Sequence, residues 1–465
     1  MSHRGISSVS SDRAVGLSRP ARYPVGLRIR AVPRRLARRR SGTALSLAIS
    51  VALLVLRPTG AQAGGAWIYE IGAPDLGTAS AGRAALAADA STAFGNPAGM
   101  TRLDGSQLLF GLQPFVVTTE FDTGPQTNVA NGGTNGGNAG GFIPSGGVYG
   151  VYSLMRDLKL GLAFNSYAGG ALDYQSNWVG RYYGTQAETL TFNLNPVIAY
   201  RLLPWLSFGA GFSVQWAKLK QELAINNVID QLPDGLMKYE ATNFGFGGNC
   251  GVLFEIDSRT RVGVTYRSRV NQGFSDVPTF GQVGPGLELI LQRAGFIGNH
   301  LDIDMTMPNE VMLSAYRDLT KDLAIMANFN WQNWSQFGEV GISLTSAPPK
   351  SLVSNANFSD TYQGAVGMHY RLGKPTMLLL GFAYDTSPVS VANRSPLLPL
   401  DRQIRIGVGV QWDVADDYTL SFAYEYANLG RADLNRSRGP LAGTLQGDYQ
   451  TNSLNVFEVT VSHRL

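Results

Sequence analysis

The chain has 465 residues, of which 44% are hydrophobic and only 15% are charged, whereas ordinary soluble domains carry roughly 25% charged residues. After the first 60 positions there is no uncharged apolar stretch of about 18 residues, which excludes a helical membrane protein, and the 10% aromatic content argues against disorder. The formal charge is +4, but residues 1–63 hold twelve of the 38 Lys and Arg residues and one of the 34 Asp and Glu residues. The rest of the chain is therefore acidic, which disfavours a nucleic-acid partner because phosphate binding needs a basic surface.

Residues 1–63 have the features of a secretory signal peptide preceded by an N-terminal extension. Five arginines between positions 34 and 40 precede an apolar run from 42 to 56, and Ala61-Gln62-Ala63 offers the small residues of a cleavage site. We therefore expect export and cleavage near Ala63. A single membrane anchor is the alternative, although a run of about 15 residues is shorter than a full bilayer span.

Residues 64–105 are rich in Gly, Ala and Ser and do not alternate like the chain that follows. Asn96 and Pro97 interrupt any helix there, because the residue before a proline disfavours the helical conformation. Small residues pack closely against other backbone, and a barrel of well over eight strands has more interior than its own side chains fill. We predict that 64–105 form a hatch, a plug inside the lumen; a flexible periplasmic tail is the alternative.

From residue 106 onward, segments of alternating hydrophobicity are separated by turns. In 402–412, Ile, Val and Trp at the even positions share one face, while mostly polar and Gly residues share the other. Such alternation fits a wall with lipid outside and a polar or glycine-lined lumen inside; a soluble β-sandwich is the alternative. The candidate strands are 106–121, 146–156, 158–170, 188–203, 206–223, 238–256, 261–274, 301–317, 323–336, 361–372, 376–387, 402–413, 418–428 and 452–463.

The connections between these fourteen candidate strands alternate in length. Short turns such as 156–157 and 414–417 alternate with long connections such as 122–145 and 275–300. An even strand count with this alternation places both termini on the periplasmic side and the long connections outside. We predict an all-β fold, in which 106–465 form a 14-stranded antiparallel transmembrane β-barrel closed by pairing of the last strand with the first.

Several segments carry a resemblance to a known family. Residues 76–103 (LGTASAGRAALAADASTAFGNPAGMTRL), 243–270 (NFGFGGNCGVLFEIDSRTRVGVTYRSRV), 330–339 (NWQNWSQFGE) and 382–412 resemble, in the same order, segments of the FadL family of outer-membrane transporters for long-chain fatty acids and hydrocarbons. The resemblance covers essentially the whole chain after residue 63 and implies localisation in the outer membrane. It also implies a monomeric fourteen-stranded barrel that captures hydrophobic substrate outside and releases it when the hatch changes conformation.

The same resemblance points to gating residues. Asn96, Pro97 and Ala98 match the family's hatch motif, which is tied to gating. We therefore expect these three residues to take part in opening the hatch.

A fatty acid has an apolar tail and a carboxylate, so its route needs an apolar capture surface and a cation. The connection 284–296 contains Leu287, Leu289, Ile290 and Leu291 and is expected on the outside. Exposed apolar clusters usually mark binding surfaces. The alternative is that this connection folds inward over the barrel mouth.

Three further side chains are candidates for substrate contact. Strand parity turns Arg267 and Arg405 toward the lumen, where they could bind the carboxylate or pair with nearby acids. Trp178 belongs to an aromatic and basic cluster at 177–183 in another outer connection. This cluster could contact substrate or form part of the aromatic belt at the membrane surface.

No pattern of catalytic or metal-binding residues is present. The sequence lacks a Gly-x-Ser-x-Gly elbow, a His-x-x-x-His pair and a phosphate-binding loop, so we expect no enzymatic activity, metal site or cofactor. The leading hypothesis is an outer-membrane transporter that takes up long-chain fatty acids or related hydrophobic compounds by hatch-gated passive diffusion. An aromatic hydrocarbon importer of the same family, a general diffusion porin and a structural or adhesin barrel are the alternatives. The expected partners are the hydrophobic substrate and outer-membrane lipid.

Overall fold

The structure is a computed structural model that describes residues 67–465, apart from 338, 345–349, 356 and 440. The expected signal peptide, its cleavage site near Ala63 and the first residues of the expected hatch lie outside the described residues. In the part of the chain that is described, no helix is both long enough and apolar enough to cross a membrane.

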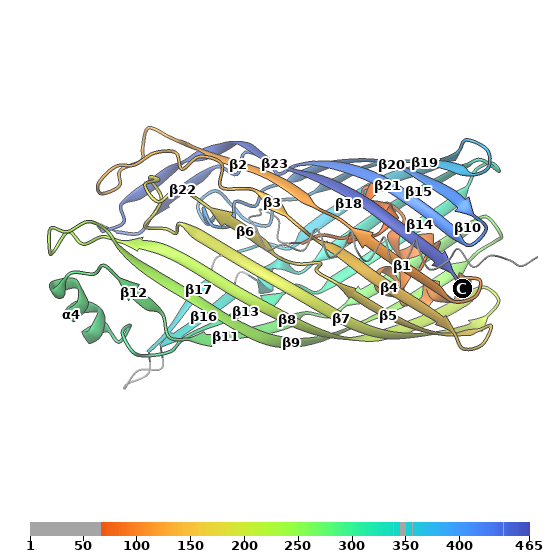
Figure 1. Ribbon diagram of the computed structural model, residues 1–465, viewed down its shortest axis with the longest axis horizontal. Helices are drawn as coiled ribbons and strands as arrows, with labels where there is room; N and C mark the ends of the chain where they lie inside the picture. Colours follow the sequence, from red (N-terminus) through yellow and green to blue (C-terminus); the bar gives the residue numbers. More distant parts are fainter. Residues whose placement is uncertain (1–66, 338, 345–349, 356, 440) are drawn as a thin grey trace, which may run out of the picture. The chain divides into compact units, whose positions relative to one another are not determined.

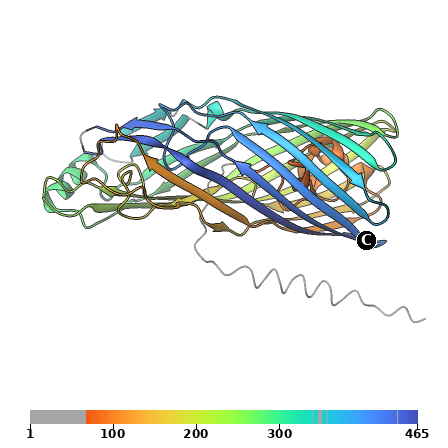
Figure 2. The same cartoon turned by 90° about the horizontal axis from the view of Figure 1, so that it is seen from above.

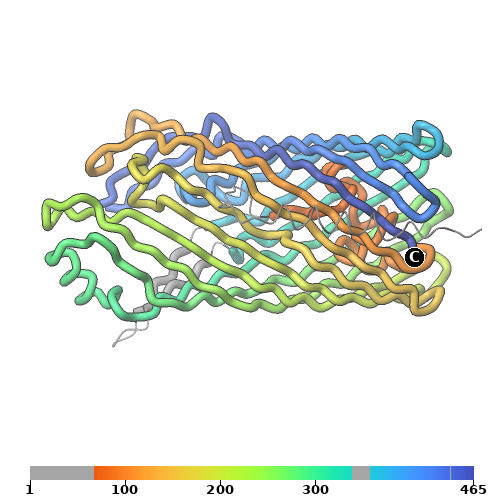
Figure 3. Tube along the Cα trace, viewed as in Figure 1, coloured from red at the N-terminus to blue at the C-terminus, as the bar shows by residue number. Residues whose placement is uncertain are grey.

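Fourteen strands of the described chain close into one antiparallel ring (Figures 1 and 3). Each pairs with the next, and the last pairs with the first, so the ring has no free edge. Around the barrel they are β1 (Gln107–Leu112), β4 (Gly146–Ser153), β5 (Leu158–Asn165), β7 (Gln186–Leu203), β8 (Leu206–Ile225), β9 (Gly235–Glu255), β10 (Thr260–Arg267), β14 (Glu310–Asp318), β15 (Leu323–Gln332), β18 (Thr361–Arg371), β19 (Thr376–Asp385), β20 (Gln403–Ala415), β21 (Tyr418–Asn428) and β23 (Thr444–Arg464). The strand count and the closure predicted from alternation are confirmed.

Short strands extend the wall at the end away from the C-terminus (Figure 1). They are β2 (Phe115–Thr123), β3 (Phe142–Ile143), β6 (Gly170–Asp173), β12 (Thr279–Gly281) and β22 (Leu434–Ser437). The expected strand 106–121 is interrupted at Gln113 and Pro114, so that β1 and β2 are separate elements. Proline has no N–H to donate to a ladder, which is the physical reason for the break.

The outer parts of four neighbouring strands form a separate sheet. It consists of β11 (Val270–Asp276), β13 (Leu301–Met307), β16 (Glu339–Leu344) and β17 (Lys350–Asn355). The ring strands that lead into it end at one level, where Arg267, Glu310, Gln332 and Thr361 lie side by side. The spans 261–274 and 301–317, expected to be continuous, are therefore each divided. The 3-10 helix η3 (Trp334–Gln336) follows β15 at the same level.

The hatch lies inside the ring, at the end where β23 finishes (Figures 1 and 2). Its elements are η1 (Pro74–Thr78), α2 (Arg83–Leu86), α3 (Thr92–Gly95) and η2 (Pro97–Arg102). Small side chains allow it to contact the wall closely: Ala84 is completely buried, and a Cβ on Gly263 of β10 would overlap the carbonyl group of Ala84. The predicted hatch inside the lumen is confirmed.

The outward face of the wall changes polarity along each long strand, as β8 illustrates. Phe208 and Phe212 are 43% and 52% exposed on the part nearer the hatch end. Beyond Trp216 the same face carries Lys218 and Lys220, which form ion pairs with acidic side chains. Aromatic residues mark the membrane surface in such barrels, so the lipid-facing band ends near Trp216.

The inward face of β8 changes in the opposite sense. Ser207, Ser213 and Gln215 are buried and polar at membrane level, whereas Ala217 and Leu219 are buried and apolar beyond it. The lumen-facing side of β8 is therefore polar on the part nearer the hatch and apolar on the part beyond Trp216. The apolar part of the inward face of β8 therefore lies outside the lipid-facing band, and it is suited to contact hydrophobic molecules.

Replacing Gly263 by Ile should displace the hatch and raise the ionic conductance of the purified barrel in planar bilayers. The new side chain would occupy the space of the Ala84 carbonyl group, and a closely packed interface cannot absorb this volume without moving. The matched control is Gly364→Ile on β18, where an added Cβ meets no atom within 4 Å. Low conductance for both variants would contradict the close seating of the hatch.

Candidate functional site

A cavity of about 380 Å³ lies in the part of the barrel beyond Trp216, away from the hatch. Its volume lies in the range typical of small-molecule sites. The wall contributes Leu219 and Leu223 from β8 and Ile303, Met305 and Met307 from β13. Met side chains adapt to ligands of varied shape, so such a lining suits a flexible hydrophobic molecule.

The connections between strands complete the lining of this cavity. They supply the aromatic rings of Tyr183, Phe337 and Phe358 and the apolar side chains of Leu397 and Leu429. A second, mainly apolar cavity of about 90 Å³ lies where β5 and β6 are separated, and its lining includes Gly169 and Thr189, which also line the large cavity. The two cavities are therefore neighbours, and the smaller one extends to Ile68 at the start of the described hatch.

Arg438 is the only Lys or Arg among the described residues that line the large cavity. Its guanidinium lies 4.9 Å from the ring centroid of Tyr183 and donates a long hydrogen bond of 3.5 Å to the Tyr183 carbonyl oxygen. Within the described chain it forms no ion pair with a carboxylate. It can therefore offer charge to an anionic ligand. Sequence reasoning missed Arg438, because a single cation in a long outer connection carries no distinguishing pattern.

The cluster around Trp178 closes one side of the outer mouth. Trp178 is fully buried, stacks on Tyr174 with a centroid separation of 3.9 Å and donates from Nε1 to the Gly184 carbonyl oxygen at 3.0 Å. Burial raises the pKa of Tyr174, so its hydroxyl stays protonated and donates to the Pro396 carbonyl oxygen at 2.8 Å. This geometry favours a role for Trp178 in packing the outer connections, since it lines neither the large nor the 90 Å³ cavity.

The apolar outer connection contains a helix, α4 (Pro285–Ala294), at the outer rim (Figure 1). The carboxylate of Asp230, from the β8–β9 connection, caps it by accepting from the Gly286 and Leu287 amides at 2.8 and 2.9 Å. Leu287 is buried, whereas Leu289 and Ile290 are 47% and 46% exposed. The structure therefore leaves part of the expected capture surface open to solvent; Leu291 is half-buried.

Arg405 joins the hatch to the wall. Its guanidinium lies 2.7 Å from Glu70 of the hatch segment, 3.3 Å from Asp385 of β19 and 3.6 Å from Glu425 of β21. The hydroxyl of Tyr69 donates to Asp385 at 3.0 Å. Parity correctly predicted an inward side chain. Of the two uses that remained open, the geometry favours pairing with acids, and binding a substrate carboxylate would require these pairs to separate.

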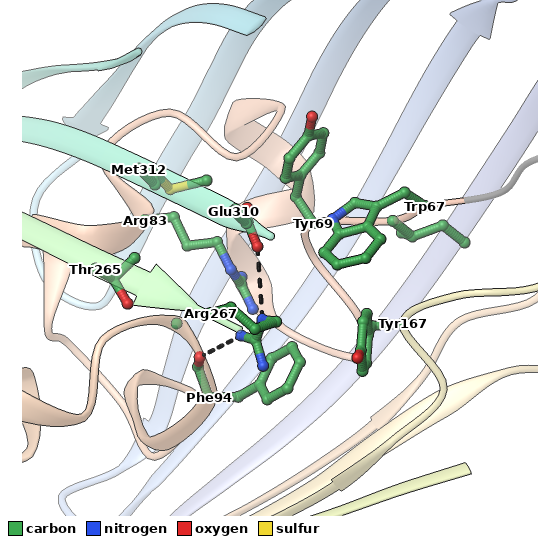
Figure 4. Close-up of a pocket in the computed structure, with 11 residues that line it drawn as sticks. Trp67, Tyr69, Arg83, Phe94, Tyr167, Thr265, Arg267, Glu310 and Met312 are labelled. Atoms are coloured by element: carbon green, nitrogen blue, oxygen red, sulfur yellow. Dashed lines mark hydrogen bonds and ion pairs between the residues drawn. The ribbon is translucent and has the colours of Figure 1, made fainter. Parts of the chain in front are cut away.

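Arg267 is also seated between the wall and the hatch (Figure 4). It lies 3.5 Å from Glu310 of β14, donates to the Phe94 carbonyl oxygen at 3.0 Å and stacks 3.7 Å from the Phe94 ring centroid. A water-sized cavity of about 10 Å³ adjoins it and is also lined by Thr265 and Tyr167. In this conformation Arg267 holds α3 against β10 instead of presenting a free cation.

Four wall cations donate to backbone carbonyl oxygens at the ends of the hatch helices. These carbonyls lack partners within their own helices, and cations near helix C-termini are favourable. The contacts are Arg261 to Ala85 and Leu86 (2.7 and 2.8 Å), Arg267 to Phe94 (3.0 Å), Arg201 to Thr101 (2.8 Å) and Lys159 to Leu103 (3.0 Å). The hatch is thus held largely through its backbone.

The motif Asn96, Pro97 and Ala98 lies where two hatch helices meet the wall. Asn96 Oδ1 accepts from the Ala98 amide at 3.1 Å and so caps η2, in which Pro97 takes the first position. Asn96 Nδ2 donates to the carbonyl oxygens of Ala84 in α2 and Val252 in β9, at 2.7 and 3.1 Å. One side chain therefore couples α2, η2 and the wall.

No group of three or more metal-binding side chains in the described ranges could hold a metal ion.

Comparisons with known proteins agree with this architecture. The family model described as outer membrane protein transport protein (OMPP1/FadL/TodX) matches residues 54–464. The long-chain fatty acid transport protein of Escherichia coli O6:H1 is 27% identical over 437 residues, covering 87% of this chain and 95% of that protein. The crystal structure of a Pseudomonas aeruginosa FadL homologue has a TM-score of 0.78 at 17% identity, covering 86% of this chain and 100% of the other. That of the Ralstonia pickettii toluene transporter TbuX has a TM-score of 0.60 at 16% identity, with the same coverage.

Replacing Arg405 by Leu should loosen the hatch and raise ionic conductance in planar bilayers. The change leaves the buried carboxylates of Glu70, Asp385 and Glu425 without their shared cation, and breaking a buried pair costs about 3–5 kcal/mol. The control is Arg431→Leu, which removes an ion pair with Asp448 in which the arginine side chain is 66% exposed, and exposed pairs contribute little. Unchanged conductance in the Arg405 variant would contradict its role as a hatch anchor.

Proposed function

The chain belongs to the outer membrane protein transport family (OMPP1/FadL/TodX), and from this premise we propose that it takes up long-chain fatty acids by hatch-gated passive diffusion. It is a β-barrel of the outer membrane, in a family whose relatives include proteins named as transporters of long-chain fatty acids and of toluene. The family is one of transport proteins.

The observation that carries the proposal is the apolar cavity of about 380 Å³ above a hatch held by wall contacts. A general diffusion porin needs a water-filled lumen from end to end, and both the apolar lining and the hatch oppose this. Hydrophobic substrate would enter the cavity from outside and remain bound there until the hatch rearranges. The exposed Leu289 and Ile290 of α4 would collect it at the outer rim.

Arg438 supports a fatty acid over an aromatic hydrocarbon as the substrate. A carboxylate in the large cavity can pair with the guanidinium of Arg438, which has no acidic partner in the described chain, whereas a hydrocarbon supplies no charge to it. The aromatic lining from Phe337 and Phe358 suits a monoaromatic hydrocarbon as well. Uptake of aromatic hydrocarbons is therefore the second candidate function.

The test of the proposed function is uptake of labelled oleate, with toluene measured in parallel, by cells that lack their own transporter and express this chain. Asn96→Ala should reduce oleate uptake severalfold, because its bonds couple α2, η2 and β9, and without them the parts of the hatch no longer rearrange together. The control is Asn435→Ala on β22, where the side chain is exposed. Toluene uptake without oleate uptake would favour the second candidate, and uptake of neither would contradict transport of hydrophobic compounds.

Replacing Arg438 by Ala should weaken oleate binding to the purified protein by roughly 10- to 100-fold, since a charged hydrogen bond contributes about 1.5–3 kcal/mol. Binding of oleyl alcohol, which has the same tail and no charge, should change little. Arg438→Lys should retain part of the oleate affinity through its charge. Equal losses for oleate and oleyl alcohol would assign Arg438 to packing instead of carboxylate recognition.

A further inference from the structure

A group of inward-facing carboxamides lies on the wall between the apolar cavities and the hatch. All are at most 4% exposed, and we refer to them as the amide row. Its members are Asn165 of β5, Asn193 and Asn195 of β7, Gln215 of β8, Asn249 of β9 and Gln272 of β11. Asn193 is the centre, because in the ladders it stands directly opposite Asn165 on one side and Gln215 on the other.

The amide row is only partly hydrogen-bonded. Asn195 Nδ2 donates to Asn249 Oδ1, and Gln272 Nε2 donates to Gln215 Oε1, both at 3.0 Å. Within the described residues, however, both Nδ2 and Oδ1 of Asn193 lack a partner, as do Asn165 Oδ1, Asn249 Nδ2 and Gln272 Oε1. Buried polar groups without partners are costly and uncommon in folded proteins, so a cluster of them calls for a ligand or for function.

Two carboxamides that hold the hatch are bonded at both ends. Gln113 Nε2 donates to the Glu70 carbonyl oxygen at 2.7 Å, and its Oε1 accepts from the Gly72 amide at 2.5 Å. Asn328 likewise accepts from the Gly82 amide at 2.7 Å and donates to the Ser80 carbonyl oxygen. In contrast, neither end of the Asn193 carboxamide has a partner among the described residues.

The position of the row places it on the route through the barrel. Thr189 of β7 lines both apolar cavities, and Asn193 follows four residues later on the same inward face. On the other side, Tyr167 lines the small cavity shared with Arg267 and Phe94 of the hatch (Figure 4). A molecule that leaves the cavities toward the hatch thus passes the row.

We propose that the amide row is a transit site for the carboxyl head of an amphiphile, so that the barrel passes carboxylic acids in preference to hydrocarbons. The N–H groups of a carboxamide can donate to the oxygens of a carboxylate, and its carbonyl oxygen can accept from the O–H of the same head group when that group is protonated. A hydrocarbon at the same place offers neither group and leaves the amides buried without partners. This inference rests on the proposed transport function and names the substrate class that the amide row selects.

The test uses Asn193→Leu in the full-length chain, expressed in cells that lack their own transporter. Labelled oleate and labelled hexadecane, a hydrocarbon of similar chain length, are supplied in parallel. Oleate uptake should fall roughly tenfold while hexadecane uptake stays level or rises, because one or two head-group hydrogen bonds are lost. Folded barrel in the membrane is quantified for each variant by its heat-dependent migration on gels.

Two variants serve as controls. Asn193→Gln keeps the donor and the acceptor and should restore a large part of oleate uptake. Asn435→Leu makes the same chemical change at an exposed position on β22 and should leave both uptakes unchanged. Should Asn193→Leu fail to fold, Asn165→Leu at the neighbouring strand provides the same comparison.

The proposal is overturned if folded Asn193→Leu takes up oleate as well as the original chain, or if oleate and hexadecane uptake fall equally. It is also overturned if the unaltered chain prefers hexadecane. Uptake of neither compound by the unaltered chain would instead contradict the proposed transport function on which the inference rests. A loss confined to oleate, restored by Asn193→Gln, supports the head-group site.

Discussion

A plug made of short helices can lie inside a closed barrel only if the backbone groups at its helix ends find partners in the wall. Helices of four to six residues, as in the hatch, leave most of their carbonyl groups without internal partners. Cations from three different wall strands satisfy several of them. Attachment through backbone groups leaves the hatch side chains free to be small, and small side chains allow the close contact with wall glycines such as Gly263.

The polarity of both faces of β8 reverses near Trp216. This level separates the part of the barrel that contains the hatch from the part that contains the large cavity. On the hatch side of this level β8 has lipid-facing aromatic side chains outside and polar side chains inside; beyond it, charged side chains face outward and apolar side chains face the lumen. An amphiphile therefore meets an apolar environment first and a polar one second. Arg405 and Arg267 lie in the part that contains the hatch, where each forms ion pairs with acidic side chains and contacts the hatch.

The fold could be predicted well from the sequence, because lipid on one face of every strand imposes strict alternation. Pro114 and Pro308 lie at two of the strand breaks, between β1 and β2 and between β13 and β14, whereas no proline marks the break between β10 and β11. Parity correctly turned Arg267 and Arg405 inward. Their acidic partners lie on other strands or in the hatch, 20 to 335 positions away for Arg405, so pairing could not be predicted. The incomplete bonding of Asn193 likewise emerges only when neighbouring strands are assembled.

The sheet formed by β11, β13, β16 and β17 has backbone ladders only among its own strands in the described chain. The register of the ring that encloses the hatch therefore does not depend on backbone ladders with these outer strands. Sequence changes in the outer hairpins would alter the outline of the mouth without shifting that register. The sequence of the outer hairpins can therefore diverge while the ring that spans the membrane keeps its structure.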